Sequence, residues 1–103
     1  MSDLKPIDLK PIRIPKTHYK LGNACYDSGK YQEAIESYKQ AIGIDPDFAL
    51  AHGGLGDAYY KSGMYEEAIK SYKQAIWIEP DYALAHYGLG NAYRKLEEKK
   101  MAT

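Results

Sequence analysis

Residues 55–86 read LGDAYYKSGMYEEAIKSYKQAIWIEPDYALAH, and nearly the same pattern stands 34 positions earlier, at residues 21–52. Nine of the 32 aligned pairs differ and the other 23 are identical. A third copy starts at Ala83 with ALAHYGLGNAYRK and stops after about half a unit. Repetition at a fixed period of roughly 20–50 residues is the signature of a solenoid, in which each repeat buries its apolar face against its neighbours.

Each copy predicts two helices. In the second copy, apolar and small residues recur at helical spacing over residues 55–62 and again over 65–76. Gly63 lies between the two runs, where a left-handed glycine commonly ends a helix. Pro80 disfavours a helical residue before it, so the second helix ends there and the next begins at Ala83. Because the connections are short, the helices of each pair are expected to be antiparallel.

This pattern resembles the tetratricopeptide repeat (TPR) family, whose units of 34 residues fold as helix–turn–helix pairs. The residues that carry the likeness are Leu21, Gly22, Tyr31, Ala34, Tyr38, Ala41 and Pro46, and again Leu55, Gly56, Tyr65, Ala68, Tyr72, Ala75 and Pro80. The resemblance implies an all-α, short right-handed α-solenoid of about two and a half units and five helices. Its repeats would be residues 15–48 and 49–82, followed by a half repeat or C-terminal capping helix at 83–103.

In this family the first helices line a concave groove that binds peptide segments of partner proteins. The resemblance therefore implies a non-catalytic protein–protein interaction module. Five of the seven charged residues at the groove positions are basic, which favours a ligand with acidic neighbours. The groove positions are Lys16, Tyr19, Lys20, Asn23, Tyr26, Asp27, Leu50, Gly53, Gly54, Asp57, Tyr60, Lys61, Leu84, Tyr87, Gly88, Asn91, Arg94 and Lys95.

Some members of the family bind the acidic C-terminus of heat-shock chaperones through a clamp of lysine, arginine and asparagine side chains. Only one residue of that clamp, Asn23, is present here. The other four clamp positions hold Tyr19, Gly54, Leu84 and Gly88. We therefore expect a peptide ligand other than a chaperone C-terminus.

Three glycines cluster at Gly53, Gly54 and Gly56, as they would in a phosphate-binding loop. No β pattern precedes them and their spacing differs from that of such a loop, so a helix is predicted instead. The resemblance gives Gly56 the family's small-residue position, where the second helix approaches through Ala68. Gly53 and Gly54 each cost roughly 1 kcal/mol in a helix. They reflect either sequence drift or a groove floor kept bare for the backbone of a partner.

Composition argues against several other classes of protein. The 14 Lys and Arg residues balance 14 Asp and Glu, so no strongly basic face for nucleic acid is indicated. No apolar run is long enough to cross a membrane, and the start lacks a secretory signal. With Cys25 as its single cysteine, the chain is expected to be cytoplasmic.

No set of residues predicts catalysis, a cofactor or a metal site. Acid pairs, Ser–His–Asp sets and Cys–His sets do not emerge once the repeat accounts for the residues, so we expect no enzyme. His18, His52 and His86 stand at 34-residue intervals, on helices separated by roughly 8–10 Å, which is too far for three ligands to share one ion. They are expected to pack between helices, where the family commonly has tryptophan.

The two ends raise the question of self-association. Prolines favour an extended chain over residues 1–14, which would be a linker or a strip that docks in the groove. Trp77 replaces Gly43 on an outer helix, and Tyr93 and Leu96 keep an apolar side on the last helix. These three residues predict a homo-oligomer, so a self-assembling scaffold unit is the alternative function. An excised or engineered TPR fragment is a further possibility.

Overall fold

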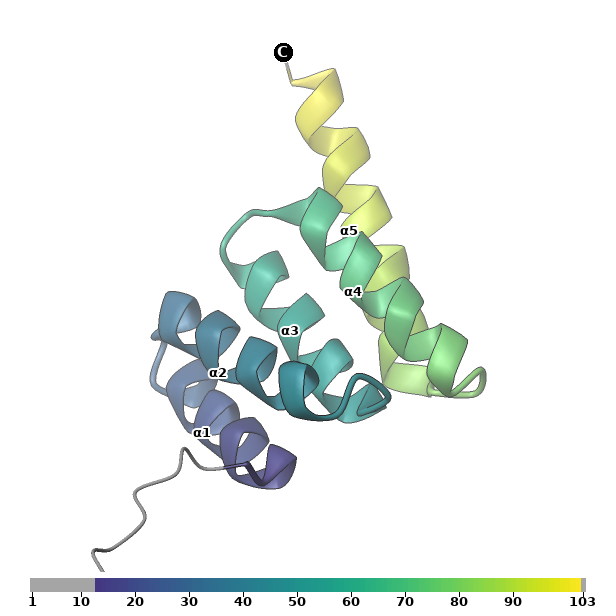
Figure 1. Cartoon of the computed structure of the whole chain (residues 1–103). Coiled ribbons are helices and arrows are strands. Elements are labelled where there is room, and N and C mark those ends of the chain that lie inside the picture. The colour runs from purple at the N-terminus through teal and green to yellow at the C-terminus, as the bar shows by residue number, and fades with distance from the viewer. Residues whose placement is uncertain (1–12, 103) are drawn as a thin grey trace, which may run out of the picture.

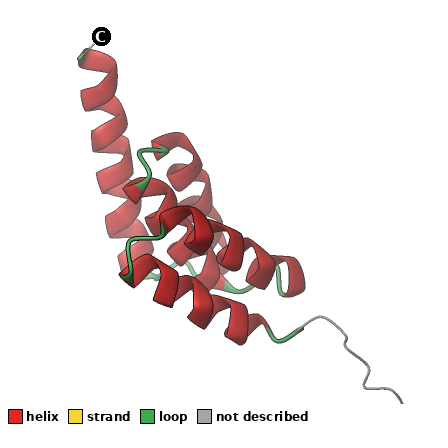
Figure 2. Cartoon of the chain, turned by 90° about the vertical axis from the view of Figure 1, so that its left-hand side faces the viewer, coloured by secondary structure: helices red, strands yellow, loops and turns green. Residues whose placement is uncertain are grey.

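The computed structural model describes residues 13–102, and this part of the chain folds as five α-helices without a strand. The helices are α1 (Pro15–Asp27), α2 (Tyr31–Ile44), α3 (Ala49–Lys61), α4 (Tyr65–Ile78) and α5 (Ala83–Met101). They make two helical hairpins and a longer fifth helix, whose C-terminal end projects beyond the other helices (Figures 1 and 2). The expected all-α, right-handed solenoid is confirmed. Residues 1–12 of the expected extended leader lie outside the described residues.

The hairpin turns are set by glycine, as the sequence predicts. Gly29 and Gly63 have φ angles of 77° and 76°, in the left-handed region that glycine enters without a steric penalty. Each turn is closed by backbone hydrogen bonds, such as the one from Lys30 N to Cys25 O at 2.8 Å. The chain reverses within three residues, so α1 and α2 pack as an antiparallel pair, and α3 and α4 do the same.

Two of the three regularly spaced histidines connect a helix to the turn before it. His52 Nε2 lies 2.8 Å from the carbonyl oxygen of Pro46, and His86 Nε2 lies 2.7 Å from that of Pro80. Each bond fixes the proline turn against the first turns of the following helix. Residues 13–102 contain no group of three side chains that could hold a metal ion. None of the helices formed by these residues is long and apolar enough to cross a membrane.

The helices form two layers. In the inner layer α1 packs against α3, and α3 packs against α5. In the outer layer α2 packs on α1 and α3, while α4 packs on α3 and α5, and α2 and α4 make no contact with each other. The helix α3 therefore has neighbours on most of its sides, and seven of its 13 residues are buried.

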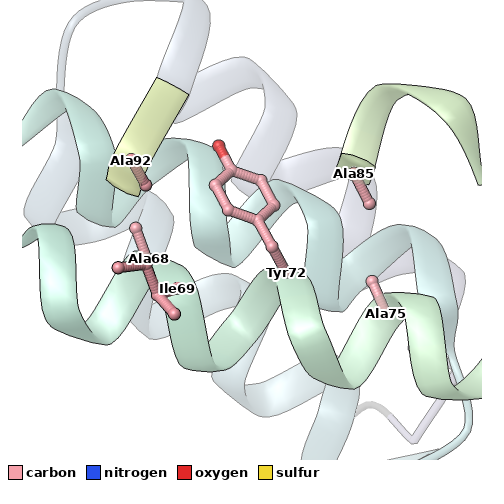
Figure 3. Close-up of a cluster of buried hydrophobic side chains, with 6 residues drawn as sticks. All are labelled: Ala68, Ile69, Tyr72, Ala75, Ala85 and Ala92. Carbon is pink, nitrogen blue, oxygen red and sulfur yellow. The ribbon is translucent and has the colours of Figure 1, made fainter. Parts of the chain in front are cut away.

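The core consists of two equivalent clusters, one for each hairpin. The cluster of the second hairpin contains Ala68, Ile69, Tyr72 and Ala75 from α4 and two alanines from α5. Figure 3 shows the Tyr72 ring projecting from α4, with Ala85 and Ala92 of α5 on either side. Alanines let the helices approach closely, and a single large ring fills the space that remains.

Glycines make room for the two buried tyrosine rings. A Cβ atom on Gly22 would lie 2.7 Å from the Tyr38 ring, and one on Gly54 would lie equally close to the same ring. These distances are shorter than any that real Cβ atoms tolerate, so a side chain at either position would displace Tyr38. The ring is thus held between a glycine of its own hairpin and a glycine of the next first helix.

The second buried ring is flanked in the same way, which gives the clustered glycines a physical reason. A Cβ atom would lie 2.7 Å from the Tyr72 ring if placed on Gly56 and 2.5 Å if placed on Gly88. The Tyr72 ring therefore requires glycine at position 56. The resemblance to the family had instead implied that the second helix approaches Gly56 through Ala68. A Cβ atom on Gly53 would lie 2.7 Å from the hydroxyl of Tyr82. From the sequence, Gly53 and Gly54 had two explanations, sequence drift and a groove floor kept bare for a partner. Neither of them predicted that these glycines make room for tyrosine side chains.

A tyrosine-lined groove as the candidate functional site

Two cavities lie along the inner layer of helices. The first has a volume of about 340 Å³ and is lined by Tyr19, Asn23, Tyr26, Asp27, Tyr38, Leu50, Gly54, Asp57, Tyr82 and Leu84. The second has a volume of about 220 Å³ and is lined by Tyr26, Asp57, Tyr60, Lys61, Tyr72, Leu84, Tyr87, Gly88 and Asn91. Tyr26, Asp57 and Leu84 line both cavities, which therefore join into one groove across α1, α3 and α5. We call this surface the groove.

The groove brings together 13 of the 18 predicted groove positions: Tyr19, Asn23, Tyr26, Asp27, Leu50, Gly54, Asp57, Tyr60, Lys61, Leu84, Tyr87, Gly88 and Asn91. The other five do not line it. Lys16 and Lys20 are exposed on α1, and Gly53 is buried against Tyr82. Arg94 and Lys95 lie further along α5, with Glu98 oxygens at 4.0 and 3.6 Å from their nitrogens.

This distribution changes the charge of the site. Of the seven charged residues at the predicted groove positions, the cavities retain both carboxylates, Asp27 and Asp57, but only one cation, Lys61. The basic excess of the sequence pattern therefore lies outside the lining of the groove. The lining of these two cavities therefore carries two carboxylates and one ammonium group.

Three tyrosines that were not among the predicted groove positions also line the groove. Tyr38 and Tyr72 belong to the apolar stripes of the second helices, and Tyr82 precedes α5. The rings of Tyr38 and Tyr72 are 2% exposed, yet their hydroxyl ends reach the inner layer because glycines stand on both sides. The sequence did hold a signal for these residues, because positions 38 and 72 are tyrosine and not phenylalanine. A buried phenol usually has a hydrogen-bond partner, which indicates a polar group close to each ring.

The two buried phenols make equivalent hydrogen bonds to different partners. Tyr38 Oη donates to Asn23 Oδ1 at 2.5 Å, and Tyr72 Oη donates to Asp57 Oδ1 at 2.5 Å. Asn23 and Asp57 occupy the same position in successive repeats. The floor of the groove is therefore neutral in the first repeat and carries a carboxylate in the second.

Burial alters the acid–base behaviour of this floor. It raises the pKa of Asp57 above its usual 3.8, although the hydrogen bond from Tyr72 and the charge of Lys61 both oppose the shift. Asp57 is exposed as a whole residue, so the tyrosines that line the cavity around its carboxylate remove only part of its hydration. Burial also raises the pKa of Tyr72, and the hydrogen bond to Asp57 raises it further. The phenol therefore stays protonated and continues to donate at neutral pH.

We expect Asp57→Asn to be more stable than the parent chain at pH 7. A raised folded-state pKa means that the folded chain binds the proton more tightly than the unfolded chain. The contribution of Asp57 to stability is therefore greatest below about pH 3.8 and is lost as the pH rises through the folded-state pKa. Asparagine keeps the acceptor for Tyr72, as Asn23 does for Tyr38.

Thermal unfolding followed by circular dichroism at pH 7 and pH 3 tests this expectation. The midpoint of the variant should exceed that of the parent at pH 7, and the two should converge at pH 3. Asp81→Asn, in an exposed turn, serves as the control and should behave like the parent. A variant that unfolds at lower temperature than the parent at pH 7 would contradict the desolvation of Asp57.

Helical hairpins that repeat every 34 residues, with their first helices aligned along a groove, define a class of repeat scaffold. A family model described as TPR repeat matches residues 22–63 and 56–96. The chain belongs to the TPR repeat family.

Relatives and solved structures agree with this assignment. The chain is 35% identical over 46 residues to the small glutamine-rich tetratricopeptide repeat-containing protein 2 of Mycosarcoma maydis, a match that covers 45% of this chain and 13% of that protein. It is similar to the second TPR of Spaghetti (RPAP3) bound to the HSP90 peptide SRMEEVD, with a TM-score of 0.79, 34% identity, and coverage of 82% of this chain and 78% of that one. A crystal structure of MamA protein matches with a TM-score of 0.80 and 29% identity over 87% of this chain and 49% of that one.

Proposed function

We propose that this chain is a non-catalytic protein–protein interaction module that binds a peptide segment of its partner in the groove. The observation that carries the proposal is the apolar surface that the fold leaves open there. Leu84 is 73% exposed and Tyr87 is 72% exposed, although both line the groove. Large apolar side chains that line a concave surface without being buried are typical of a binding site.

The similarity to a TPR domain bound to an HSP90 peptide supports this general mode of binding. It does not extend to the same ligand. The groove holds Tyr19, Gly54, Leu84 and Gly88 where a chaperone clamp has its polar and basic side chains. We therefore propose an extended or helical peptide whose apolar side chains pack on the tyrosines of the groove.

We expect the double variant Leu84→Ala and Tyr87→Ala to bind peptide at least about 30-fold more weakly, because truncation of an interface anchor costs about 2 kcal/mol or more. The ligands are 12-residue peptides enriched from a random display library on the whole chain. Fluorescence anisotropy with the synthetic peptides then measures the dissociation constants. Both side chains are mostly exposed, so their removal should leave the thermal midpoint nearly unchanged.

Trp77→Ala is the matched control, since Trp77 is 82% exposed and does not line the groove. It should bind the same peptides as the parent chain does. If selection enriches no peptide, the proposed function fails. If enriched peptides bind the groove variant as tightly as the parent, the binding site lies elsewhere.

A second candidate function, self-assembly, is favoured by the surface around Trp77. This side chain borders an apolar cavity of about 440 Å³ between α4 and α5, which is also lined by Ile76 and Leu89. In the preceding repeat the same position is Gly43, so the fold does not require an aromatic ring there. Tyr93 is 44% exposed, with Lys73 Nζ 5.7 Å from its ring centre, whereas Leu96 packs on the core of the second hairpin.

If a second copy covers this surface, the parent chain should show a molar mass that rises with concentration, and Trp77→Ala should shift the equilibrium toward the monomer. Removing a large exposed ring from an isologous interface affects both copies and therefore acts twice. Light scattering coupled to size-exclusion chromatography measures the mass from low to high micromolar concentration. A parent chain that stays monomeric throughout would eliminate this candidate, and Leu84→Ala provides a control outside the surface.

A further inference from the structure

The centre of the groove is a carboxylate. Asp57 is one of only three residues that line both cavities, so a ligand that spans the groove must pass it. Within residues 13–102 its hydrogen-bond partner is Tyr72 alone, and no ion pair to Asp57 forms. Lys61 lines the same cavity four residues further along α3 and lowers the pKa of Asp57 without pairing with it. The carboxylate therefore retains capacity to accept a hydrogen bond from a ligand.

Aromatic rings surround this carboxylate. Seven tyrosines line the two cavities: Tyr19, Tyr26, Tyr38, Tyr60, Tyr72, Tyr82 and Tyr87. The faces of such rings carry partial negative charge and attract cations, most strongly where water is excluded. Two of the rings are restrained by neighbouring rings, because Tyr26 and Tyr60 each pack against another tyrosine with ring centres 5.4 Å apart. The walls of the cavity are thus held in place before a ligand arrives.

Electrostatics of the lining disfavours an acidic ligand. Two carboxylates, Asp27 and Asp57, face a single ammonium group, Lys61, along the groove. An acidic peptide would bring a further negative charge to a carboxylate that has already lost part of its hydration to the surrounding tyrosines. A cation would instead compensate this partly desolvated charge, and a close pair of opposite charges across an interface can contribute to binding.

We propose that the groove recognises a basic side chain, a lysine or an arginine, which enters the smaller cavity and pairs with Asp57 among Tyr26, Tyr60 and Tyr87. The apolar neighbours of that basic residue would pack on Leu84 and the remaining tyrosines. This inference rests on the proposed function, since it assigns the chemistry of the peptide that the same groove binds. It distinguishes this chain from domains that grip carboxylates, because the central charge is of the opposite sign.

The repeat itself supplies a variant that removes the charge and retains the geometry. Asp57→Asn gives the second repeat the asparagine that the first repeat has at position 23. Asn23 Oδ1 accepts a hydrogen bond from the hydroxyl of Tyr38 at 2.5 Å. Tyr72 would keep its acceptor, so the ring and the wall of the cavity would stay in place. Asn91→Asp is the complementary variant, because Asn91 lines the same cavity and a carboxylate there adds negative charge.

The test begins with peptides enriched from the random display library on the parent chain. We expect them to share a lysine or arginine flanked by apolar residues. Replacing that residue with glutamine in a synthetic peptide should weaken binding to the parent chain about tenfold, the usual effect of a close charge pair at a partly desolvated site. The same replacement should have little effect on binding to Asp57→Asn and a larger effect on binding to Asn91→Asp. The control Asp81→Asn should reproduce the parent.

The outcomes separate this inference from the proposed function. The inference would be overturned, and groove binding left intact, if the enriched peptides lacked a common basic residue. The same conclusion would follow if replacing that residue weakened binding to Asp57→Asn as much as binding to the parent chain. Enrichment of acidic peptides would lead to the same conclusion. An absence of any enriched peptide would overturn the proposed function itself. The thermal midpoint of each variant shows whether a loss of binding reflects a loss of fold.

Discussion

Tyr72→Ala should lower the free energy of unfolding by about 3–5 kcal/mol, the range seen when a large buried ring is removed from a core. A domain of this size has a total stability of about 5–15 kcal/mol, so this single change should remove at least about a fifth of the total. The Tyr72 ring is 2% exposed and contacts α3 and α5 through Gly56 and Gly88. Its loss removes packing between three helices at once. Chemical denaturation monitored by circular dichroism measures the change.

Two phenylalanine variants divide this effect into its parts. Tyr72→Phe keeps the ring but leaves Asp57 without its donor, which should cost about 1.5 kcal/mol, the low end for a hydrogen bond to a charged group, because Asp57 is an exposed residue and water can replace part of the bond. Tyr38→Phe strands the neutral Asn23 and should cost less. Adding Asp57→Asn to Tyr72→Phe should recover part of the loss. Equal costs for the two phenylalanine variants would show that the charge of Asp57 has no influence on the hydrogen bond.

The same substitution at two glycines of α5 should have opposite effects. A Cβ atom on Gly88 would lie 2.5 Å from the Tyr72 ring, whereas one on Gly90 meets nothing within 4 Å. Gly90→Ala should stabilise the chain by roughly 1 kcal/mol, because alanine is the better helix former. Gly88→Ala gains the same propensity but should lose about 1–3 kcal/mol by overpacking, since the Tyr72 ring is buried and held by Asp57.

The expected separation between these two variants is about 1–3 kcal/mol, or several degrees in thermal midpoint. Because both changes are Gly→Ala in one helix, effects on the unfolded state cancel. Gly43→Ala, on α2 with open space around the position, is a second control and should resemble Gly90→Ala. If Gly88→Ala stabilised the chain as much as Gly90→Ala does, the Tyr72 ring would have to move freely, and the tight packing described above would be wrong.

Much of the fold follows from the repeat alone. Identical spacing of residues in two copies predicts identical hairpins, and Gly29 and Gly63 are found in the left-handed conformation expected of them. The start of α5 at Ala83 also agrees with the position of Pro80. These features are local, since they depend on the conformational limits of glycine and proline and on periodicity along one helix.

The candidate site was predictable only in outline. The resemblance to the TPR family places Tyr26, Asp57 and Tyr87 on one face with the other groove positions, but it does not say how far along that face a cavity extends. Lys16 and Lys20 hold groove positions of the family and nevertheless lie outside the lining of the two cavities. Of the five basic residues at the predicted groove positions, only Lys61 lines the two cavities, because the packing of neighbouring helices decides which residues a cavity includes.

The sequence by itself determined the five helices with their turns, and its resemblance to the TPR family implied the class of fold and the first helices as the inner layer. Tertiary structure alone decided that Gly54 and Gly88 exist for the rings of Tyr38 and Tyr72, and that these phenols pass between helices to form the floor of the groove. The reason is that repeats and turns follow from steric rules acting within a few residues. Contact between a tyrosine and a glycine 16 positions away depends on how closely two helices pack, and the pattern of one helix does not contain that distance.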